Sequence, residues 1–166
     1  MRPAGDLELI VQPDDRVERV LELLHGVQDS LEMKQFTLHE HSVIDAIIRA
    51  HQRGVQVRVM LNPHRTGGSR VNDETYEKLR EHGVPVEWTN PQFVITHEKS
   101  MVLDGRRALI ATFNLSKKYF GQTRDYGVLT SNPVQVEEIR RCFEADWKRA
   151  PFRPAPKTNL AWSADN

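Results

Sequence analysis

Residues 94–112, VITHEKSMVLDGRRALIAT, contain two apolar segments on either side of an Asp104-Gly105 dipeptide. Asp-Gly between apolar segments is a strong signal for a tight turn. The stretch therefore predicts a β-hairpin with strands at 94–104 and 106–112. The segments that precede the hairpin follow a different pattern of secondary structure.

Before the hairpin, strand-like and helix-like segments alternate. Helices are indicated by apolar residues at helical spacing, and strands by short runs rich in β-branched residues. This order is typical of consecutive βαβ units, in which parallel strands are joined by helices. The expected strands are 7–12, 31–37, 55–61 and 84–88, and the expected helices follow the PDD at 13–15 and cover 41–53 and 73–82.

After the hairpin, residues 125–130 predict one more strand and residues 133–149 a long helix. The predicted fold class is α/β, an α/β/α sandwich around a mixed, largely parallel sheet. We expect residues 1–150 to form one domain. The Pro-rich stretch that follows predicts a linker, or the start of a second half, over 151–166.

Composition narrows the choice of function only a little. The 23 Lys and Arg balance the 23 Asp and Glu, so net charge gives no reason to expect nucleic acid as an obligatory partner. One cysteine, Cys142, cannot form a disulfide within the chain, and no Cys/His spacing predicts a metal site. No signal peptide or transmembrane segment is evident, which favours a cytoplasmic protein, at most peripheral to a membrane.

The hairpin places a phosphate-binding set together. His97 and Lys99 are two residues apart, so their side chains leave the same face of a strand. Thr112 ends the second strand and Asn114 lies just beyond it, so a hydroxyl and an amide can reach the same place. A phosphodiester is anionic, and a nucleophile can approach it only when fixed donors neutralise its charge. We expect Lys99, Thr112 and Asn114 to bind phosphate.

His97 is the candidate nucleophile of this set. A neutral imidazole can attack phosphorus and form a phosphohistidine if its other nitrogen is held by a hydrogen-bond acceptor. Asp125 is the acidic candidate for that role. The predicted catalytic residues are therefore His97, Lys99, Asn114 and Asp125, and the scheme needs neither a metal ion nor a cofactor.

The same residues resemble the H-x-K-x4-D-x6-G-S-x-N motif of the phospholipase D superfamily. The spacing from His97 through Lys99 and Asp104 to Asn114 follows that motif. The resemblance implies that His97 is nucleophile or general acid, that Lys99 and Asn114 hold phosphate, and that Asp125 is the acidic partner of the histidine. Two residues depart from the motif: Ala111 and Thr112 replace the usual glycine and serine. Asp104 is explained by its place in the turn, so we leave it out of the catalytic set.

Only one such motif is present, although the leaving group needs a proton from a second acid. In this superfamily the second histidine comes from an identical subunit or from a second motif-bearing half, so we expect a homodimer or such a half as partner. The first hypothesis for function is a phosphodiesterase or phosphatidyltransferase acting on phospholipids. One alternative is a dimeric nuclease with a basic groove made by Arg65, Arg70, Lys117 and Lys118; the other is an inactive phosphate-binding module.

Overall fold

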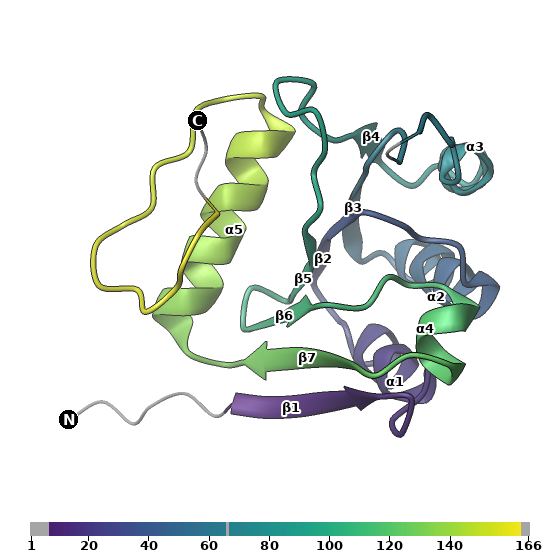
Figure 1. The fold of residues 1–166 in the computed structure, drawn as a ribbon, viewed down its shortest axis with the longest axis horizontal. Helices are drawn as coiled ribbons and strands as arrows, with labels where there is room; N and C mark the ends of the chain where they lie inside the picture. The colour runs from purple at the N-terminus through teal and green to yellow at the C-terminus, as the bar shows by residue number, and fades with distance from the viewer. Residues whose placement is uncertain (1–6, 66, 164–166) are drawn as a thin grey trace.

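The computed structural model describes residues 7–65 and 67–163 of the chain, which form one seven-stranded sheet with helices on both faces (Figure 1). Along the chain the elements are β1 (Leu7–Gln12), α1 (Glu18–His25), β2 (Ser30–Gln35), α2 (His41–Gln52), β3 (Gln56–Leu61), α3 (Asp73–Glu81), β4 (Val86–Trp88), β5 (Lys99–Leu103), β6 (Arg107–Ala111), α4 (Lys117–Gly121), β7 (Asp125–Thr130) and α5 (Pro133–Trp147).

The strand order in the sheet is β1-β7-β6-β5-β2-β3-β4. Only β2–β3 and β3–β4 are parallel, and the other four pairs are antiparallel. The sheet is mixed, as predicted, but the expectation that it is largely parallel is wrong. Two features explain the difference: β5, β6 and β7 follow one another as antiparallel neighbours, and β1 pairs with β7 at the far edge instead of with β2.

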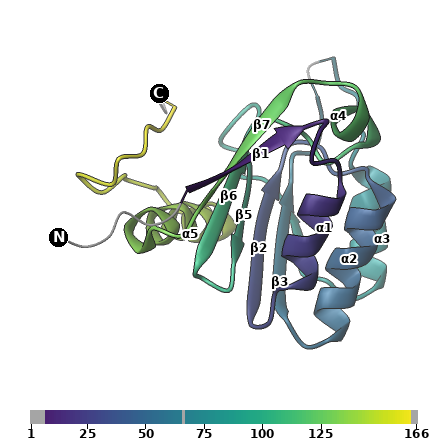
Figure 2. The same cartoon turned by 90° about the horizontal axis from the view of Figure 1, so that it is seen from below.

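Helices α1, α2 and α3 lie on one face of the sheet and α5 lies on the other, which confirms the α/β/α sandwich (Figure 2). The larger core lies on the face of α1 to α3. There the apolar stripe of α2 is buried, and its members are Val43, Ile44, Ile47 and Ile48. Gly54, at φ +93°, follows the helix and lets the chain turn into β3. Among the helices that the structure describes, none combines the length and the apolar character needed to cross a membrane.

Three segments differ from the expectations. The first hairpin strand begins at Lys99, five residues later than predicted, so His97 lies in the irregular segment before it. The polar loop before β7 contains a short helix, α4, that the sequence did not indicate. Residues 151–163 form no strand, so the second half expected to begin there stays a prediction; residues 164–166 lie outside the described residues.

Candidate active site

The predicted site residues lie at one end of the sheet because of the antiparallel hairpin. Lys99 begins β5, Thr112 follows the last residue of β6, and Asp125 begins β7. Adjacent antiparallel strands bring the start of one beside the end of the next. The carboxyl end of β2 meets the same edge, since Gln35 is the cross-strand partner of Lys99.

His97 and Lys99 are in direct contact. The Lys99 Nζ atom is 3.2 Å from each ring nitrogen of His97 and donates a 2.7 Å hydrogen bond to the His97 carbonyl oxygen. Lys99 is 4% exposed, whereas the His97 ring is open to solvent. An ordered cation thus lies beneath an accessible imidazole, an arrangement that can hold an anion against the ring.

Burial lowers the pKa of both groups, and for His97 the Lys99 charge adds to the effect. Burial, then the Lys99 charge, holds the pKa of His97 below its ordinary value of 6.5. Burial lowers the pKa of Lys99 to about 8, with the Asp125 charge acting the other way. At neutral pH the imidazole is therefore neutral and nucleophilic while most of the ammonium groups keep their proton.

Asp125 contacts hydroxyl groups. Its carboxylate accepts hydrogen bonds from Thr112 Oγ1 at 2.7 Å and from Thr123 Oγ1 at 2.5 Å. Among the described residues, no hydrogen bond joins Asp125 to His97. The carboxylate therefore orients the Thr112 hydroxyl in this state, and its predicted role in holding the His97 tautomer stays a prediction.

Asn114 is positioned by the end of β2. The amide of Leu115 donates to the Thr37 carbonyl at 3.0 Å, which ties the segment after β6 to the segment after β2. Asn114 is 4% exposed, and its Oδ1 atom is buried without a hydrogen-bond partner among the described residues. This amide oxygen can accept a hydrogen bond from a ligand, and the amide nitrogen of the same side chain is the group that could donate to a phosphate oxygen.

The structure adds residues that the sequence did not single out. The Phe36 ring lies 4.7 Å from the His97 ring, and the Lys99 Nζ atom is 5.3 Å from the Phe36 centroid. Asn62 accepts a 2.9 Å hydrogen bond from the Thr96 amide, just before His97. Both residues follow strands that end at the same edge of the sheet, and that position was the one signal that could have revealed them.

The basic loop residues do not gather into one set. Arg65 donates to the Thr37 hydroxyl at 3.1 Å, close to Phe36, and no carboxylate among the described residues pairs with it. Arg70 pairs with Asp73 at 2.7 Å. Lys117 and Lys118 are exposed on α4. Of these four residues, Arg65 is the one whose surroundings favour a role at the site.

Asp104 has a structural role, as its place in the turn indicated. With φ at +54°, it accepts hydrogen bonds from the amides of Asp29 at 2.7 Å, Ser30 at 3.0 Å and Gln28 at 3.1 Å. These bonds join the hairpin turn to the loop before β2. They also lower the pKa of Asp104, against the opposing effect of its burial.

Asp104→Asn is expected to lower the free energy of unfolding by about 1.5 kcal/mol at pH 7, because charge-assisted hydrogen bonds are lost. Asparagine tolerates the positive φ, so the substitution adds little strain. The folded pKa is depressed, so the carboxylate stabilises the fold above pH 3.8 and loses this effect as the pH falls further. Urea unfolding at pH 7 and pH 3 checks this; equal stability of both proteins at pH 7 would contradict it.

The chain is similar in sequence to a known protein family and to several of its members. The family model described as "Cardiolipin synthase, PLD-like domain" matches residues 20–147. The mitochondrial cardiolipin hydrolase of Xenopus laevis is 30% identical over 137 residues, which cover 81% of this chain and 62% of that protein. The major cardiolipin synthase ClsA of Bacillus subtilis is 23% identical over 165 residues, covering 88% of this chain and 34% of that protein. The chain thus spans less than two-thirds of these relatives.

Among solved structures, the phospholipase D family member Nuc from Salmonella typhimurium superposes with a TM-score of 0.78. The superposition covers 91% of this chain and 99% of Nuc at 18% sequence identity, so it concerns the fold alone. With the match of the family model over most of the chain, this fold and the motif residues lead to one conclusion: the chain belongs to the phospholipase D superfamily, in the family of cardiolipin synthase PLD-like domains.

Proposed function

We propose that this chain provides one half-site of a metal-independent phosphodiesterase in which His97 is the nucleophile. The observation that carries the proposal is the contact between a solvent-accessible His97 ring and the buried Lys99 ammonium, 3.2 Å apart. The lowered pKa of His97 supports the same role, because attack needs a neutral imidazole. Known members of the superfamily, such as cardiolipin hydrolases, act on phosphodiesters.

In the proposed reaction a nitrogen of His97 forms a bond to phosphorus as the bond to the leaving oxygen breaks. Lys99, Thr112 and Asn114 stabilise the charge on the remaining phosphate oxygens. The leaving oxygen takes a proton from an acid opposite His97, and water or an alcohol then cleaves the phosphohistidine and returns the histidine to its neutral form. Asp125 orients the Thr112 hydroxyl, and we propose that it also supports the His97 imidazole when substrate is bound.

Phospholipid is the substrate class that we favour. The curated relatives that match most of this chain are named for hydrolysis or synthesis of cardiolipin. The charges also favour it: Arg70 is neutralised by Asp73, and Arg124 pairs with Asp14 at 2.7 Å, which weakens any basic groove for nucleic acid. Action in the cytoplasm, at a membrane surface, stays a prediction.

Two substrates presented in EDTA test this choice. Cardiolipin vesicles and a single-stranded oligonucleotide are each incubated with the chain, and products are separated by chromatography. We expect phosphatidic acid and phosphatidylglycerol together from the vesicles and an intact oligonucleotide. Cleavage of the oligonucleotide alone would favour the nuclease. Retention of inorganic phosphate with no turnover of either substrate would favour the inactive binding module.

An exposed apolar area on the sheet supports assembly with a second half or a second copy. Leu9 and Val128 are cross-strand partners, and so are Val128 and Ile110, so the three side chains share one face. They are 59%, 41% and 41% exposed, and Leu7 and Tyr126 continue the row at 66% and 47%. We call these five residues the apolar face. Contiguous apolar surface of this kind is typical of an interaction site.

The apolar face lies on the same side of the sheet as α5. Ala108 packs against the α5 residues Val136 and Ile139, and Ile110 is two residues further along β6. Since α5 packs mainly on β6, β5 and β2, the edge strand β1 and its neighbour β7 are left largely without a helix over this side in the described part of the chain (Figure 2). The face runs along these strands as far as Tyr126, the residue after Asp125. We propose that a partner seated on this face contributes the second acid.

Leu9→Glu is expected to weaken this assembly without unfolding the chain, because Leu9 is exposed. We expect light scattering to show a loss of dimer, and hydrolysis in EDTA to fall about tenfold or more at concentrations well below the new dissociation constant. Gln52→Glu, on the exposed end of α2 at the opposite face, is the matched control and should change neither property. A monomeric wild-type chain with full activity would contradict the proposed assembly.

Phosphate binding should depend on the Lys99 proton. Lys99 has a pKa of about 8, so the fraction of charged ammonium falls steeply between pH 7.5 and 9.5. We expect the dissociation constant for inorganic phosphate to rise about tenfold over this range. In Lys99→Arg the guanidinium keeps its charge, so the rise should be less than about twofold. Titration calorimetry with both proteins checks this; the same pH dependence in both would contradict it.

A further inference from the structure

His97 stands outside the hydrogen-bond ladder of the sheet. Strand β5 begins at Lys99, whose cross-strand partner Gln35 closes the pairing with β2. Side chains from neighbouring strands hold the segment on each side of His97. The Thr96 amide donates to Asn62 at 2.9 Å, and the Glu98 carboxylate accepts from Lys34 Nζ at 2.7 Å. The position of His97 thus depends on side-chain contacts rather than on strand pairing.

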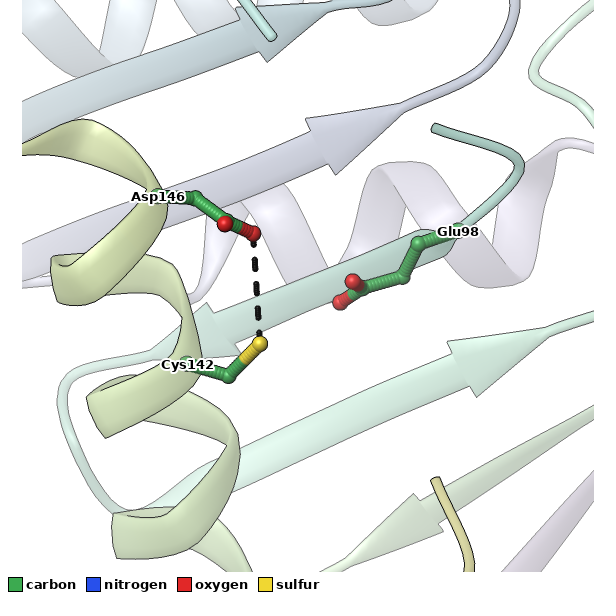
Figure 3. A group of neighbouring side chains, drawn as sticks. All are labelled: Glu98, Cys142 and Asp146. Carbon is green, nitrogen blue, oxygen red and sulfur yellow. Dashed lines mark hydrogen bonds between the residues drawn. The ribbon is translucent and has the colours of Figure 1, made fainter. Parts of the chain in front are cut away.

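The contact through Glu98 belongs to a buried charge cluster beneath α5. Lys34 is 1% exposed, and besides Glu98 it contacts Asp146 Oδ2 at 2.5 Å and Cys142 Sγ at 3.6 Å. Ser100 Oγ donates to the second carboxylate oxygen of Glu98 at 2.5 Å. Figure 3 shows the side chains of Glu98, Cys142 and Asp146 pointing toward one another between helix α5 and the sheet.

The same three side chains have the composition of a metal site that the sequence did not predict, since their ligand atoms lie within 4.8 Å of one another. However, the Lys34 ammonium already contacts both carboxylates. Those charges raise the pKa of Lys34 despite its burial, so it stays protonated. Burial raises the pKa of Cys142 to about 12, which keeps the thiol protonated and a poor metal ligand. The cluster is an ion-pair network centred on Lys34.

Glu98 is the one member of this network that lies between His97 and Lys99. Its side chain points to the α5 face, whereas Lys99, the next residue, is directed to the opposite side of the strand. We propose that Lys34, through Glu98, is a positioning residue that fixes His97 over Lys99, whereas the pairing of Lys34 with Asp146 of α5 contributes only to stability. The inference rests on the proposed function of His97. It adds to the site a buried residue, Lys34, that contacts none of the proposed catalytic residues.

Two variants separate positioning from general stability. Glu98→Gln and Asp146→Asn each remove one carboxylate charge from the same ammonium, but only Glu98 adjoins His97. We expect both to lower the melting temperature. Glu98→Gln should also lower kcat for bis(p-nitrophenyl) phosphate in EDTA about tenfold, with KM changed less than about twofold. Asp146→Asn should keep kcat within about twofold. Ser100→Ala, which leaves all charges in place, should shift kcat in the direction of Glu98→Gln.

A second readout does not need turnover. The His97 ring resonances, identified by their loss in His97→Ala, report its pKa in an NMR titration. A displaced ring should titrate closer to 6.5 in Glu98→Gln and remain as in wild type in Asp146→Asn. If the wild type shows neither turnover nor a burst of p-nitrophenolate, the proposed function fails, and this titration still tests the positioning. Wild-type kcat and titration in folded Glu98→Gln, or equal changes in both variants, would overturn the inference.

Discussion

His97→Ala is expected to lower phosphodiester hydrolysis at least about a thousandfold, because removal of a nucleophile ends the covalent route and leaves only binding and charge stabilisation. The contacts of His97 indicate that its removal lowers activity without unfolding the chain. Its ring is accessible and touches Lys99 and Phe36, so its removal leaves no large cavity in the core. The measurement is the initial rate with bis(p-nitrophenyl) phosphate in EDTA, together with the melting temperature.

The control for this prediction is His82→Ala. His82 is exposed at the end of α3, away from the hairpin, and its ring contacts the Lys78 carbonyl oxygen at 2.8 Å. We expect wild-type rates for this variant. A rate in His97→Ala within about tenfold of wild type would remove His97 from the nucleophile role.

Lys34→Met is expected to lower the free energy of unfolding by about 3–5 kcal/mol, the largest stability effect that we predict for a single substitution. Methionine fills similar space, but Glu98 and Asp146 would lose their shared cation in a buried place. Glu98 would keep only the hydrogen bond from Ser100 Oγ, and the two carboxylates, whose oxygens lie within 4.8 Å of one another, would repel without a cation between them. Urea unfolding at pH 7 provides the measurement.

The triple variant Lys34→Met, Glu98→Gln, Asp146→Asn is the matched control for Lys34→Met. It removes the uncompensated charges together with the cation, so it should recover most of the lost stability. Equal stability of the single and triple variants would show that packing, and not charge, determines the effect. Loss of less than about 1 kcal/mol in the single variant would contradict the network as a stabilising element.

Local patterns predicted the elements of this fold well where burial and period agree. The apolar stripe of α2 and the alternation of apolar and polar residues in β3 are both visible within a few consecutive residues. The bounds of these elements differ from the expected ones by about one residue. The order of strands in the sheet could not be read in the same way. Whether β1 pairs with β2 or with β7 is decided by packing between distant segments, and the expectation of consecutive βαβ units was wrong for this strand.

The candidate site, like the fold, was only partly predictable from local sequence patterns. The spacing of His97 and Lys99 predicted that both side chains leave one strand face toward a common ligand; the structure shows the two side chains in contact, but His97 does not lie on the strand. Lys99 reaches back to the His97 carbonyl oxygen, and this bond brings the two side chains together. The role of Lys34 had no local signal. It lies 64 residues from Glu98 in sequence and 112 residues from Asp146, so only the folded sheet brings them together.

The most direct test of His97 as nucleophile is a rapid-mixing experiment with excess bis(p-nitrophenyl) phosphate in EDTA. Because p-nitrophenolate leaves without needing a proton, a half-site should complete the first step even without its partner acid. We expect a burst of p-nitrophenolate and, after an alkaline quench, a phosphoryl adduct on the peptide that contains His97. A folded wild-type chain with neither burst nor adduct, or a burst that persists in His97→Ala, would contradict the account.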